Sequence, residues 1–450
     1  MKVLLISANT LREPYPVYPL GLDYVAGAIA GAHEVRCLDL NSLADDQDGL
    51  PHAVRAFGPD VIAISVRNID NTDALYPKGF MAHYRQLAQT LRRCSAAPIV
   101  LGGTGFTLFA QEIMRMLEAD YGIVGEGERL AMLLQALEQG KDPAGVPGVV
   151  VGQASAPAPD PWPRAVVRRF DPNGAHLDFY LRHGGMLNLQ TKRGCPFRCI
   201  YCSYPYIEGG RLRFAPPEQI ARTAVELQQA GARYLFITDS AFNADGAHSL
   251  AVAQAFKKQG LTIPWGGFFA PVPMPANYFR ILAECGLKHV EFGTESLCDA
   301  VLTAYRKPFS RRHVFAAHQA AQAAGLHVAH YFLFGGPGET AKTLAESFYH
   351  MDGLEKAALF LFCGMRIYPH TSLYEITLQQ GQISAGQSIL EPVFYQPPSI
   401  SLTDIARQVE AHAQGREHWV RGAGGEQTIQ ILTRMYQRGR TGPLWEYLIR

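Results

Sequence analysis

The sequence predicts an α/β protein with two or three domains built on parallel sheets. Strand-length apolar runs alternate with helical stretches twice in its 450 residues, over residues 1–140 and again over 185–382. Strands that alternate with helices form parallel sheets covered by helices. The Pro- and Ala-rich stretch 154–163 lies between these regions and predicts a linker. A chain of this length is also too long for one ordinary core.

The first region, residues 1–140, predicts a Rossmann-like domain with its ligand outside the carboxyl ends of the strands. The apolar N-terminus lacks the layout of a signal peptide and is expected to be the first strand. The expected strands are Val3–Ser7, Val35–Leu40, Val61–Val66, Ile99–Gly102 and Tyr121–Val124, and the expected helices include Gly21–Ala30 and Met81–Arg93.

Residues 141–184 are predicted as linker, and residues 185–382 predict a partial (β/α)6 barrel of the TIM type. A helix follows most of its strands, and one opens at Pro217-Glu218, where proline is tolerated and an acid suits the helix dipole. The site of such a barrel lies at the carboxyl ends of its strands. The expected strands are Met186–Thr191, Tyr234–Thr238, Trp265–Phe269, His289–Gly293, Val328–Phe334 and Phe360–Met365.

Residues 383–450 predict a mostly helical C-terminal region. Trp419, Tyr436 and Trp445 are its aromatic anchors. We expect this region to cap the mouth of the barrel.

The composition limits the partners of the chain. Lys and Arg total 41 against 40 Asp and Glu, so electrostatics give no reason to expect nucleic acid or an anionic membrane. No apolar run approaches the length of a membrane span. Only three of the eight cysteines cluster, which favours a reducing, cytoplasmic compartment over a disulfide scaffold.

Those three cysteines, Cys195, Cys199 and Cys202, have C-x3-C-x2-C spacing. Three thiolates in one loop can hold three irons of a [4Fe–4S] cluster and leave the fourth iron open, whereas electron-transfer ferredoxins use four cysteines per cluster. The alternatives are weaker. Structural zinc needs four ligands, and His183 fits no familiar zinc spacing. A disulfide leaves one cysteine unpaired and needs an oxidising compartment.

The cysteine run resembles the signature of the radical S-adenosylmethionine (SAM) enzymes. The resemblance implies that the open iron chelates SAM, and that one electron from the cluster cleaves SAM to a 5′-deoxyadenosyl radical. Cys195, Cys199 and Cys202 are then the cluster ligands at the catalytic centre.

Further motifs at strand ends extend this resemblance and imply SAM-binding residues. Asp239 alone also fits a turn or helix cap, and Glu295-Ser296 a structural turn. Lys307 matches a family position, although a solvated lysine is the simpler interpretation. The implied residues are Asp239 after the second strand, Glu295 and Ser296 in Gly-Thr-Glu-Ser, Gly335 and Gly336 in Gly-Gly-Pro-Gly-Glu, and Arg366 in Arg-Ile-Tyr-Pro-His-Thr.

The first region resembles the cobalamin-binding domain of cobalamin-dependent radical SAM enzymes. The pieces are Tyr18–Leu22, Ser65–Asp70, Leu101–Thr107 and Gly125–Glu128. Small residues after a strand permit deep insertion of a cofactor tail. A phosphate loop is the alternative for Gly-Gly-Thr-Gly, but its lysine pattern is missing. The implied cobalamin-binding residues are Leu20, Gly21, Ser65, Arg67, Asn68, Gly102, Gly103, Thr104, Thr107, Glu126 and Gly127.

The chain lacks the Asp-x-His-x-x-Gly motif that supplies a histidine to the lower face of cobalt in many cobalamin proteins. The resemblance then places Arg67 and Asn68 near that face. An ordinary salt bridge is the alternative for Arg67.

Together these resemblances imply a cobalamin-dependent radical SAM C-methyltransferase. A substrate radical would take its methyl group from methylcobalamin, with a flavodoxin or ferredoxin as electron donor. The substrate is expected to be a small molecule of the secondary-metabolite or lipid type. The alternatives are radical ring formation or rearrangement, methylation without a radical, a non-catalytic cobalamin sensor, and a methylthiotransferase, which would need a second cluster of cysteines.

Overall fold

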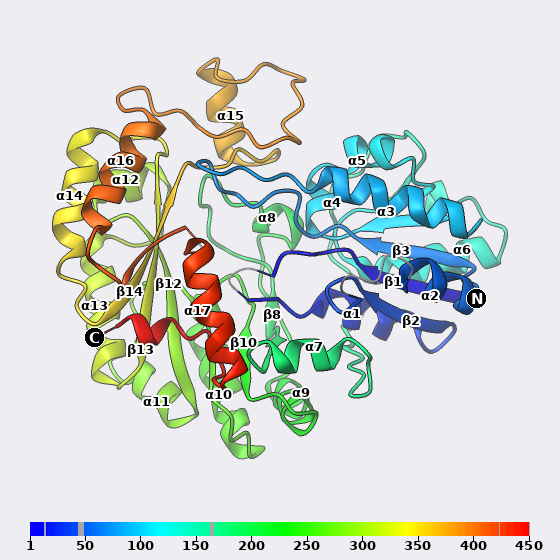
Figure 1. Cartoon of the computed structure of the whole chain (residues 1–450), viewed down its shortest axis with the longest axis horizontal. Helices are drawn as coiled ribbons and strands as arrows, with labels where there is room; N and C mark the ends of the chain where they lie inside the picture. Colours follow the sequence, from blue (N-terminus) through cyan, green and yellow to red (C-terminus); the bar gives the residue numbers. More distant parts are fainter. Residues whose placement is uncertain (13–14, 44–48, 163–165, 423, 450) are drawn as a thin grey trace.

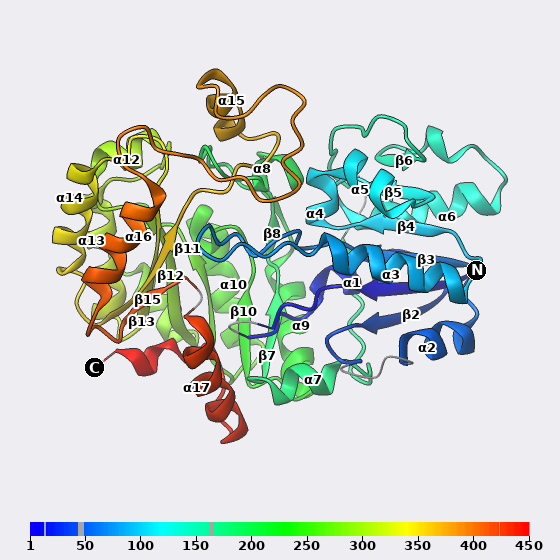
Figure 2. The same cartoon turned by 45° about the horizontal axis from the view of Figure 1, so that its top comes forward.

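The computed structural model describes residues 1–12, 15–43, 49–162, 166–422 and 424–449. Two sheets form the two halves of the molecule (Figures 1 and 2), with the N-terminal half in blue and cyan and the second half in green to red. None of the helices in these ranges has the length and apolar character needed to cross a bilayer.

The N-terminal sheet has the order β2-β1-β3-β4-β5-β6, and its first five strands are parallel. The central strands β1, β3 and β4 are largely buried on both faces, which explains their continuous apolar runs, whereas the edge strand β2 is partly exposed. In β1, Val3 and Leu5 pack under helices α1 and α6, whereas Leu4 and Ile6 pack under α3 and α5. The strands are β1 Lys2–Ser7, β2 Glu34–Asp39, β3 Val61–Ser65, β4 Ile99–Gly102 and β5 Tyr121–Ile123, and the helices are α1 Leu20–Ile29, α2 Gly49–Phe57, α3 Met81–Cys94, α4 Thr104–Leu108, α5 Ala110–Leu117 and α6 Leu130–Glu138.

This sheet extends into the stretch predicted as linker. Strand β6, Val149–Val151, pairs antiparallel with β5. Gly148 precedes it with φ +80°, a conformation that glycine adopts without strain, and its carbonyl accepts from Val124 N–H. The first sheet therefore extends to residue 151, into the stretch expected to be linker.

The second sheet has the order β15-β14-β13-β12-β11-β10-β7, with every neighbouring pair parallel. All six predicted strands of this region are confirmed. Strand β15, from the region predicted as mostly helical, adds to one edge. The strands are β7 Met186–Leu189, β10 Tyr234–Ile237, β11 Trp265–Phe269, β12 Leu287–Glu295, β13 His327–Phe334, β14 Ala357–Cys363 and β15 Trp419–Arg421.

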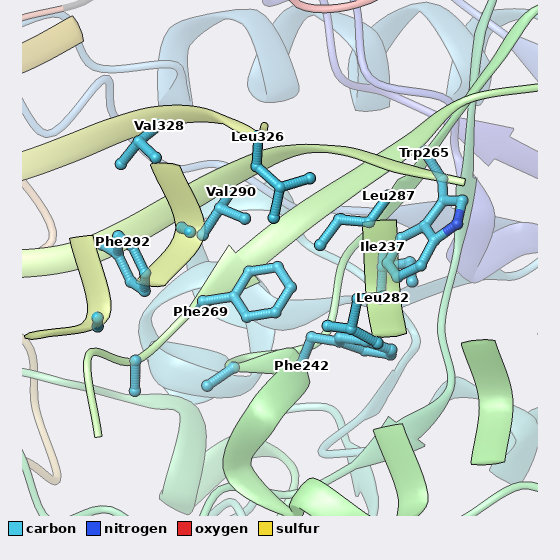
Figure 3. Close-up of a cluster of buried hydrophobic side chains, with 14 of the residues drawn as sticks. Ile237, Phe242, Trp265, Phe269, Leu282, Leu287, Val290, Phe292, Leu326 and Val328 are labelled. Atoms are coloured by element: carbon cyan, nitrogen blue, oxygen red, sulfur yellow. The ribbon is translucent and has the colours of Figure 1, made fainter. Parts of the chain in front are cut away.

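Helices cover the outer face of this sheet, as in a partial barrel (Figure 1). Alternate residues of each strand point outward into a large apolar core, shown around Val290 and Phe292 of β12 in Figure 3. Glu291, which lies between them, points inward and accepts hydrogen bonds from Tyr331 and Trp445. The covering helices are α9 Pro217–Gln229, α10 Gly246–Lys258, α11 Tyr278–Glu284, α12 Asp299–Ala304, α13 Arg311–Ala323, α14 Ala341–Met351 and α16 Leu402–Ala413.

The end of the chain enters the barrel. After α17 (Gly425–Gln437), the short helix η4 (Trp445–Leu448) places Trp445 among Ala329, Ala358 and other small or apolar residues of the strands. Its indole N–H donates to Glu291 Oε1 at 2.9 Å. This segment therefore packs inside the barrel at mid-strand, and not over the strand ends where a cap was expected.

The two domains share buried contacts. One apolar cluster joins Leu101 and Phe106 of the first domain to Tyr305 and Met365 of the barrel. Buried ion pairs also cross between the halves. Arg168 Nε lies 2.8 Å from Asp23 Oδ2, and Arg366 Nε lies 2.9 Å from Asp70 Oδ2. The halves therefore form one continuous body, and the cavities between them have defined walls.

Candidate functional site

An open cavity lies between the two domains and encloses about 1490 Å³, part of it continuous with solvent. We call it the interdomain cavity. Its floor comes from the carboxyl ends of β1, β3, β4 and β5, where a doubly wound sheet binds its ligand. Asn188, Gln190 and Arg193 are among the barrel residues that line its opposite wall.

Most of the predicted cobalamin-binding residues meet in this cavity. Thr107 lies behind it, where its Oγ1 accepts from Gly125 N–H at 3.0 Å and donates to the carbonyl of Gly103 at 2.9 Å. Asn68 donates to Asn9 at 3.2 Å, and Asn9 itself lines the cavity. The predicted residues that line the cavity directly are Leu20, Gly21, Ser65, Arg67, Gly102, Gly103, Thr104, Glu126 and Gly127.

The glycines show that this space suits an inserted ligand. A Cβ on Gly21 would meet no protein atom within 4 Å, and one on Gly102 would meet its nearest at 3.9 Å. Because both residues line the cavity, side chains there would occupy cavity space. Gly103 differs, since it has φ +104° and a Cβ would lie 2.7 Å from the carbonyl oxygen of Val66. The small residues therefore leave a cradle of the kind that a cofactor tail needs.

A second cavity of about 890 Å³ lies at the carboxyl ends of the barrel strands. We call it the cysteine cavity, because Cys195, Cys199 and Cys202 all line it. The three belong to residues 194–212, which connect strand β8 (Lys192–Arg193) to strand β9 (Arg213–Phe214). The three cysteines therefore lie at the mouth of the barrel, where the sequence predicted them.

The chemistry of the three thiols fits an iron–sulfur cluster. Burial raises the pKa of the Cys202 thiol to about 12 and raises the pKa of Cys199. Buried thiolates need a cationic partner, and iron of a cluster supplies one. The described residues hold no group of His, Cys, Asp or Glu that converges on a single metal ion. The fit to a cluster rests on the sulfur donor set and on the shared cavity.

Glu295 and Lys307 form a charged pair on the wall of the cysteine cavity. Lys307 Nζ lies 3.2 Å from Glu295 Oε1, and the hydroxyl of Tyr201 donates to the same oxygen at 2.6 Å. Burial works to lower the pKa of Lys307, but Glu295 and Cys199 outweigh it and the net shift is upward. Lys307 is therefore a buried cation beside the cysteines, and the interpretation as a solvated lysine is wrong.

Tyr204 lines both cavities. It follows the last cysteine by two residues and begins helix α8 (Tyr204–Ile207). Tyr204 is 40% exposed although it lies between the two domains. Sequence patterns gave no sign of this role, because Tyr204 belongs to no motif. The two cavities thus meet at one aromatic side chain.

Asp239 and Ser296, two of the predicted SAM-binding residues, lie behind the wall of the cysteine cavity. Asp239 accepts from Thr191 N–H at 2.8 Å and from Lys192 Nζ at 2.7 Å, and it is 2% exposed. The Ser296 hydroxyl meets that of Ser347 at 3.0 Å and accepts from Cys298 N–H at 3.1 Å. These contacts anchor the strand ends on which the cavity is built.

Gly335, Gly336 and Arg366 also lie outside the set that lines the cysteine cavity. Gly336 donates its N–H to Tyr305 Oη at 3.0 Å, and a Cβ on it would lie 2.5 Å from Met365 Cε. Arg366 joins the domains through Asp70 and also donates to the carbonyl of Ile389 at 2.7 Å. In the structure the two glycines pack against neighbouring protein groups, and Arg366 forms a bridge between the domains.

Comparison with known proteins identifies both domains. Residues 7–134 match the model of the B12 binding domain, and residues 189–348 match that of the radical SAM superfamily. The first match covers the wall of the interdomain cavity that predicted cobalamin residues form. The second begins at β7 and includes the three cysteines.

Similar proteins span most of this chain. A tryptophan 2-C-methyltransferase from Streptomyces laurentii is 25% identical over 449 residues, covering 84% of this chain and 74% of its own. An uncharacterized methyltransferase from Pyrococcus horikoshii is 25% identical over 395 residues, covering 84% and 83%. The solved structure of the radical SAM methyltransferase TsrM from Kitasatospora setae, with cobalamin and a [4Fe-4S] cluster bound, superposes with a TM-score of 0.86 at 22% identity, covering 99% of this chain and 97% of that one.

The cavities, the sulfur donor set and the two domain matches agree with one another. They confirm the resemblance on which the sequence interpretation depends. The chain combines a B12-binding domain with a radical SAM domain after it, which is the domain pair of the cobalamin-dependent radical SAM enzymes that it resembles.

Proposed function

We propose that this protein methylates an unactivated carbon of a small-molecule substrate held between the two cavities. The observation that carries the proposal is that Tyr204 lines both of them. When bound, cobalamin supplies the methyl group, and the cluster with SAM supplies the radical that opens a carbon–hydrogen bond. A substrate that contacts Tyr204 is within reach of both, and this proximity is the main contribution that the protein can make.

The residues of the cysteine cavity have separate tasks in this proposal. Cys195, Cys199 and Cys202 hold the cluster. Glu295 and Lys307 offer a carboxylate and an ammonium group for the polar ends of SAM. Asp239, Ser296, Gly335, Gly336 and Arg366 keep the strand ends and the domain interface in place, as their contacts with protein groups indicate.

Aromatic side chains make much of the wall of the cysteine cavity apolar. Phe268 and Tyr331 line it with Phe197 and Phe309. Phe268 is 38% exposed, and its ring lies edge-on to Tyr331 with centroids 6.1 Å apart. Such walls exclude water, which would otherwise quench a reactive intermediate. They also suit the apolar part of a secondary-metabolite or lipid-type substrate.

The names of the relatives support carbon as the methyl acceptor. One is named for methylation of tryptophan at carbon 2, and another, from Methylococcus capsulatus, for methylation of hopanoids at carbon 3. The two named substrates differ in class, and a carbon acceptor is what they share. A flavodoxin or ferredoxin is the proposed electron donor, and a reducing cytoplasm, which keeps the eight free cysteines and the cluster intact, is the proposed compartment.

The test is anaerobic reconstitution with iron, sulfide, cobalamin and methyl-labelled SAM, followed by incubation with candidate aromatic, acyl and polyketide substrates. We expect labelled product together with S-adenosylhomocysteine and 5′-deoxyadenosine. Labelled product with S-adenosylhomocysteine alone would mean methylation without a radical. 5′-Deoxyadenosine without label transfer would mean ring formation or rearrangement. A reconstituted protein that leaves SAM intact with reductant present would refute catalysis and favour a cobalamin sensor.

A further inference from the structure

The geometry points to Glu126 as a positioning residue that holds the cysteine loop against the cobalamin-binding domain and thereby sets the distance between the two cofactor cavities. Glu126 is one of the residues that sequence motifs implied as a cobalamin contact. The inference rests on the proposed function only in assigning the two cofactors to the two cavities.

The cysteine loop, residues 194–212, is closed at its base. Strands β8 and β9 pair antiparallel with Arg193 opposite Arg213, so these two arginines stand immediately before and after the loop. Within the loop, Cys195 N–H donates to the carbonyl of Gly209 at 3.1 Å, and Gly194 N–H donates to Glu208 Oε2 at 3.0 Å. Contacts made by Arg193 and Arg213 at the base of the loop therefore orient the whole loop.

Both basal arginines bind the same carboxylate. Arg193 Nη1 donates to Glu126 Oε1 at 2.9 Å. Arg213 forms a two-point contact, with Nη2 at 2.6 Å from Oε1 and Nη1 at 3.0 Å from Oε2. Arg193 uses its other nitrogen, Nη2, to reach Glu128 at 2.6 Å. A two-point arginine–carboxylate contact fixes direction as well as distance.

Glu126 has no acceptor position left for a cofactor. Its Oε2 also accepts from the backbone N–H of Trp162, so four donors meet its two oxygens. Burial works to raise the pKa of Glu126, but Arg213, Arg193 and the Trp162 N–H outweigh it, and the net shift is downward. The carboxylate therefore stays ionised and directed at the barrel.

The network is withdrawn from solvent, so its geometry is well defined. The side chain of Glu126 is 6% exposed, that of Arg193 11% and that of Arg213 29%. Removal of one partner from a buried ionic network leaves uncompensated charge, and the remaining groups rearrange. Salt screens such a network far less than it screens a surface pair.

The backbone on either side of Glu126 lines the interdomain cavity. Gly125 and Gly127 flank it, and both belong to that wall. Thr107 holds Gly125 through its hydroxyl, as described above. One short loop thus contacts the cobalamin cavity through its backbone and the base of the cysteine loop through its side chain. A shift of this loop changes the separation of the cofactors without removing a ligand of either.

The experiment measures that separation directly. The protein is reconstituted with the cluster and with cob(II)alamin, the cluster is reduced, and the magnetic interaction between the two paramagnets is recorded by electron paramagnetic resonance. We expect one well-defined interaction in the wild type and a broad or weakened one in Glu126→Gln. Iron and cobalamin contents should be unchanged. Methylated product per SAM consumed should fall by about 10- to 100-fold, the scale of misplacement by an ångström.

Asp120→Asn is the matched control. It removes a carboxylate charge from an ion pair within the first domain, that with Arg92, and leaves the ion pairs between the domains in place. Its magnetic interaction should stay as narrow as in the wild type. Glu126→Asp should restore part of the wild-type spectrum. If Glu126→Gln does not fold, Arg213→Gln tests the same contact with a partly exposed side chain, and a smaller shift in the same direction is expected.

Two outcomes would overturn the inference. A wild-type interaction in Glu126→Gln would show that the carboxylate does not set the separation. Loss of cobalamin binding in that variant, with the cluster retained, would make Glu126 a cofactor contact. The spectra do not depend on turnover, so a broadened interaction supports the inference even if the wild type transfers no methyl group, and failure of the proposed function is seen separately.

Discussion

Lys307 lies 3.2 Å from Glu295 inside the cysteine cavity, with side chains only 8% and 13% exposed. Glu295 adopts φ +64°, an unusual conformation for a residue with a side chain, at an irregularity in the pairing of β12 with β13. Strain of this kind persists only where the surrounding contacts hold it, and it concentrates at functional sites. The strained backbone and the buried ion pair therefore indicate a functional role for Glu295 and Lys307.

Replacement of Lys307 by methionine should destabilise the protein and impair the cluster. The change leaves Glu295 buried without its cation, which costs about 3 kcal/mol. It also removes the charge that favours the Cys199 thiolate. Chemical denaturation of the unreconstituted protein and iron content after reconstitution measure the two effects. Lys288→Met, at an exposed position, is the control, and equal behaviour of the two variants would contradict the role of the pair.

Cys199→Ala should abolish the visible absorbance of the cluster and all SAM cleavage, because two thiolates leave a second iron without its protein ligand. Absorbance after anaerobic reconstitution and chromatography of 5′-deoxyadenosine provide the measurements. Cys94→Ala, in helix α3 of the first domain, should keep both properties. SAM cleavage that survives in Cys199→Ala would disprove the cluster assignment.

Gly21→Ala should weaken cobalamin binding while slightly stabilising the cofactor-free protein. Its Cβ meets no protein atom and enters the interdomain cavity, so affinity should fall by about tenfold. Alanine is the better helix former by about 0.5–1 kcal/mol at this position in α1. Absorbance titration with cobalamin and thermal unfolding test the two directions. Gly31→Ala, also unobstructed but outside the cavity, should leave affinity unchanged.

Titration of Glu291 should make the free energy of unfolding depend on pH. Burial raises its pKa to about 7 from an ordinary 4.5, despite hydrogen bonds from Trp445 and Tyr331. The folded state binds the proton of Glu291 more tightly than the unfolded state does. The resulting stabilisation is therefore complete below the unfolded pKa and is lost as pH rises through 7. The free energy of unfolding changes by about 3 kcal/mol over this range.

Glu291→Gln should flatten this part of the profile, since glutamine does not titrate. Thermal unfolding measured between about pH 5 and about pH 8 should show the variant closing the gap to the wild type as pH rises. Glu446, His289 and Tyr15 lie near this group, so the difference between the two profiles is the relevant quantity. Parallel profiles would contradict the assignment.

Strand positions were largely predictable, because strands buried on both faces are short continuous apolar runs. Ile99–Gly102 and Trp265–Phe269 agree residue for residue with β4 and β11. Short strands at sheet edges were not predicted. Val149–Val151 and Trp419–Arg421 are three residues each, and their partners are chosen by tertiary contacts.

The site was predictable where chemistry demands particular residue types. The cysteine spacing and the small residues around Gly103 were recognisable in the sequence, and the structure places these residues on the walls of the two cavities. The positions of Asp239 and Arg366 were not predictable in the same way, because a motif states which residue occurs at a strand end but not which neighbour it meets. Lys192 and Asp70 meet them across 47 and 296 residues of sequence.

The sequence by itself determined the domain order and the cofactor classes, and it predicted the cluster ligands, since the strand pattern and the cysteine spacing are local and the motifs resemble those of known families. Only the tertiary structure decided how the domains meet. It placed Tyr204 at the junction of the cavities and joined Glu126 to Arg193 and Arg213. Such contacts join residues that are far apart in the sequence and depend on complementary charge and shape. Local sequence patterns therefore do not predict them.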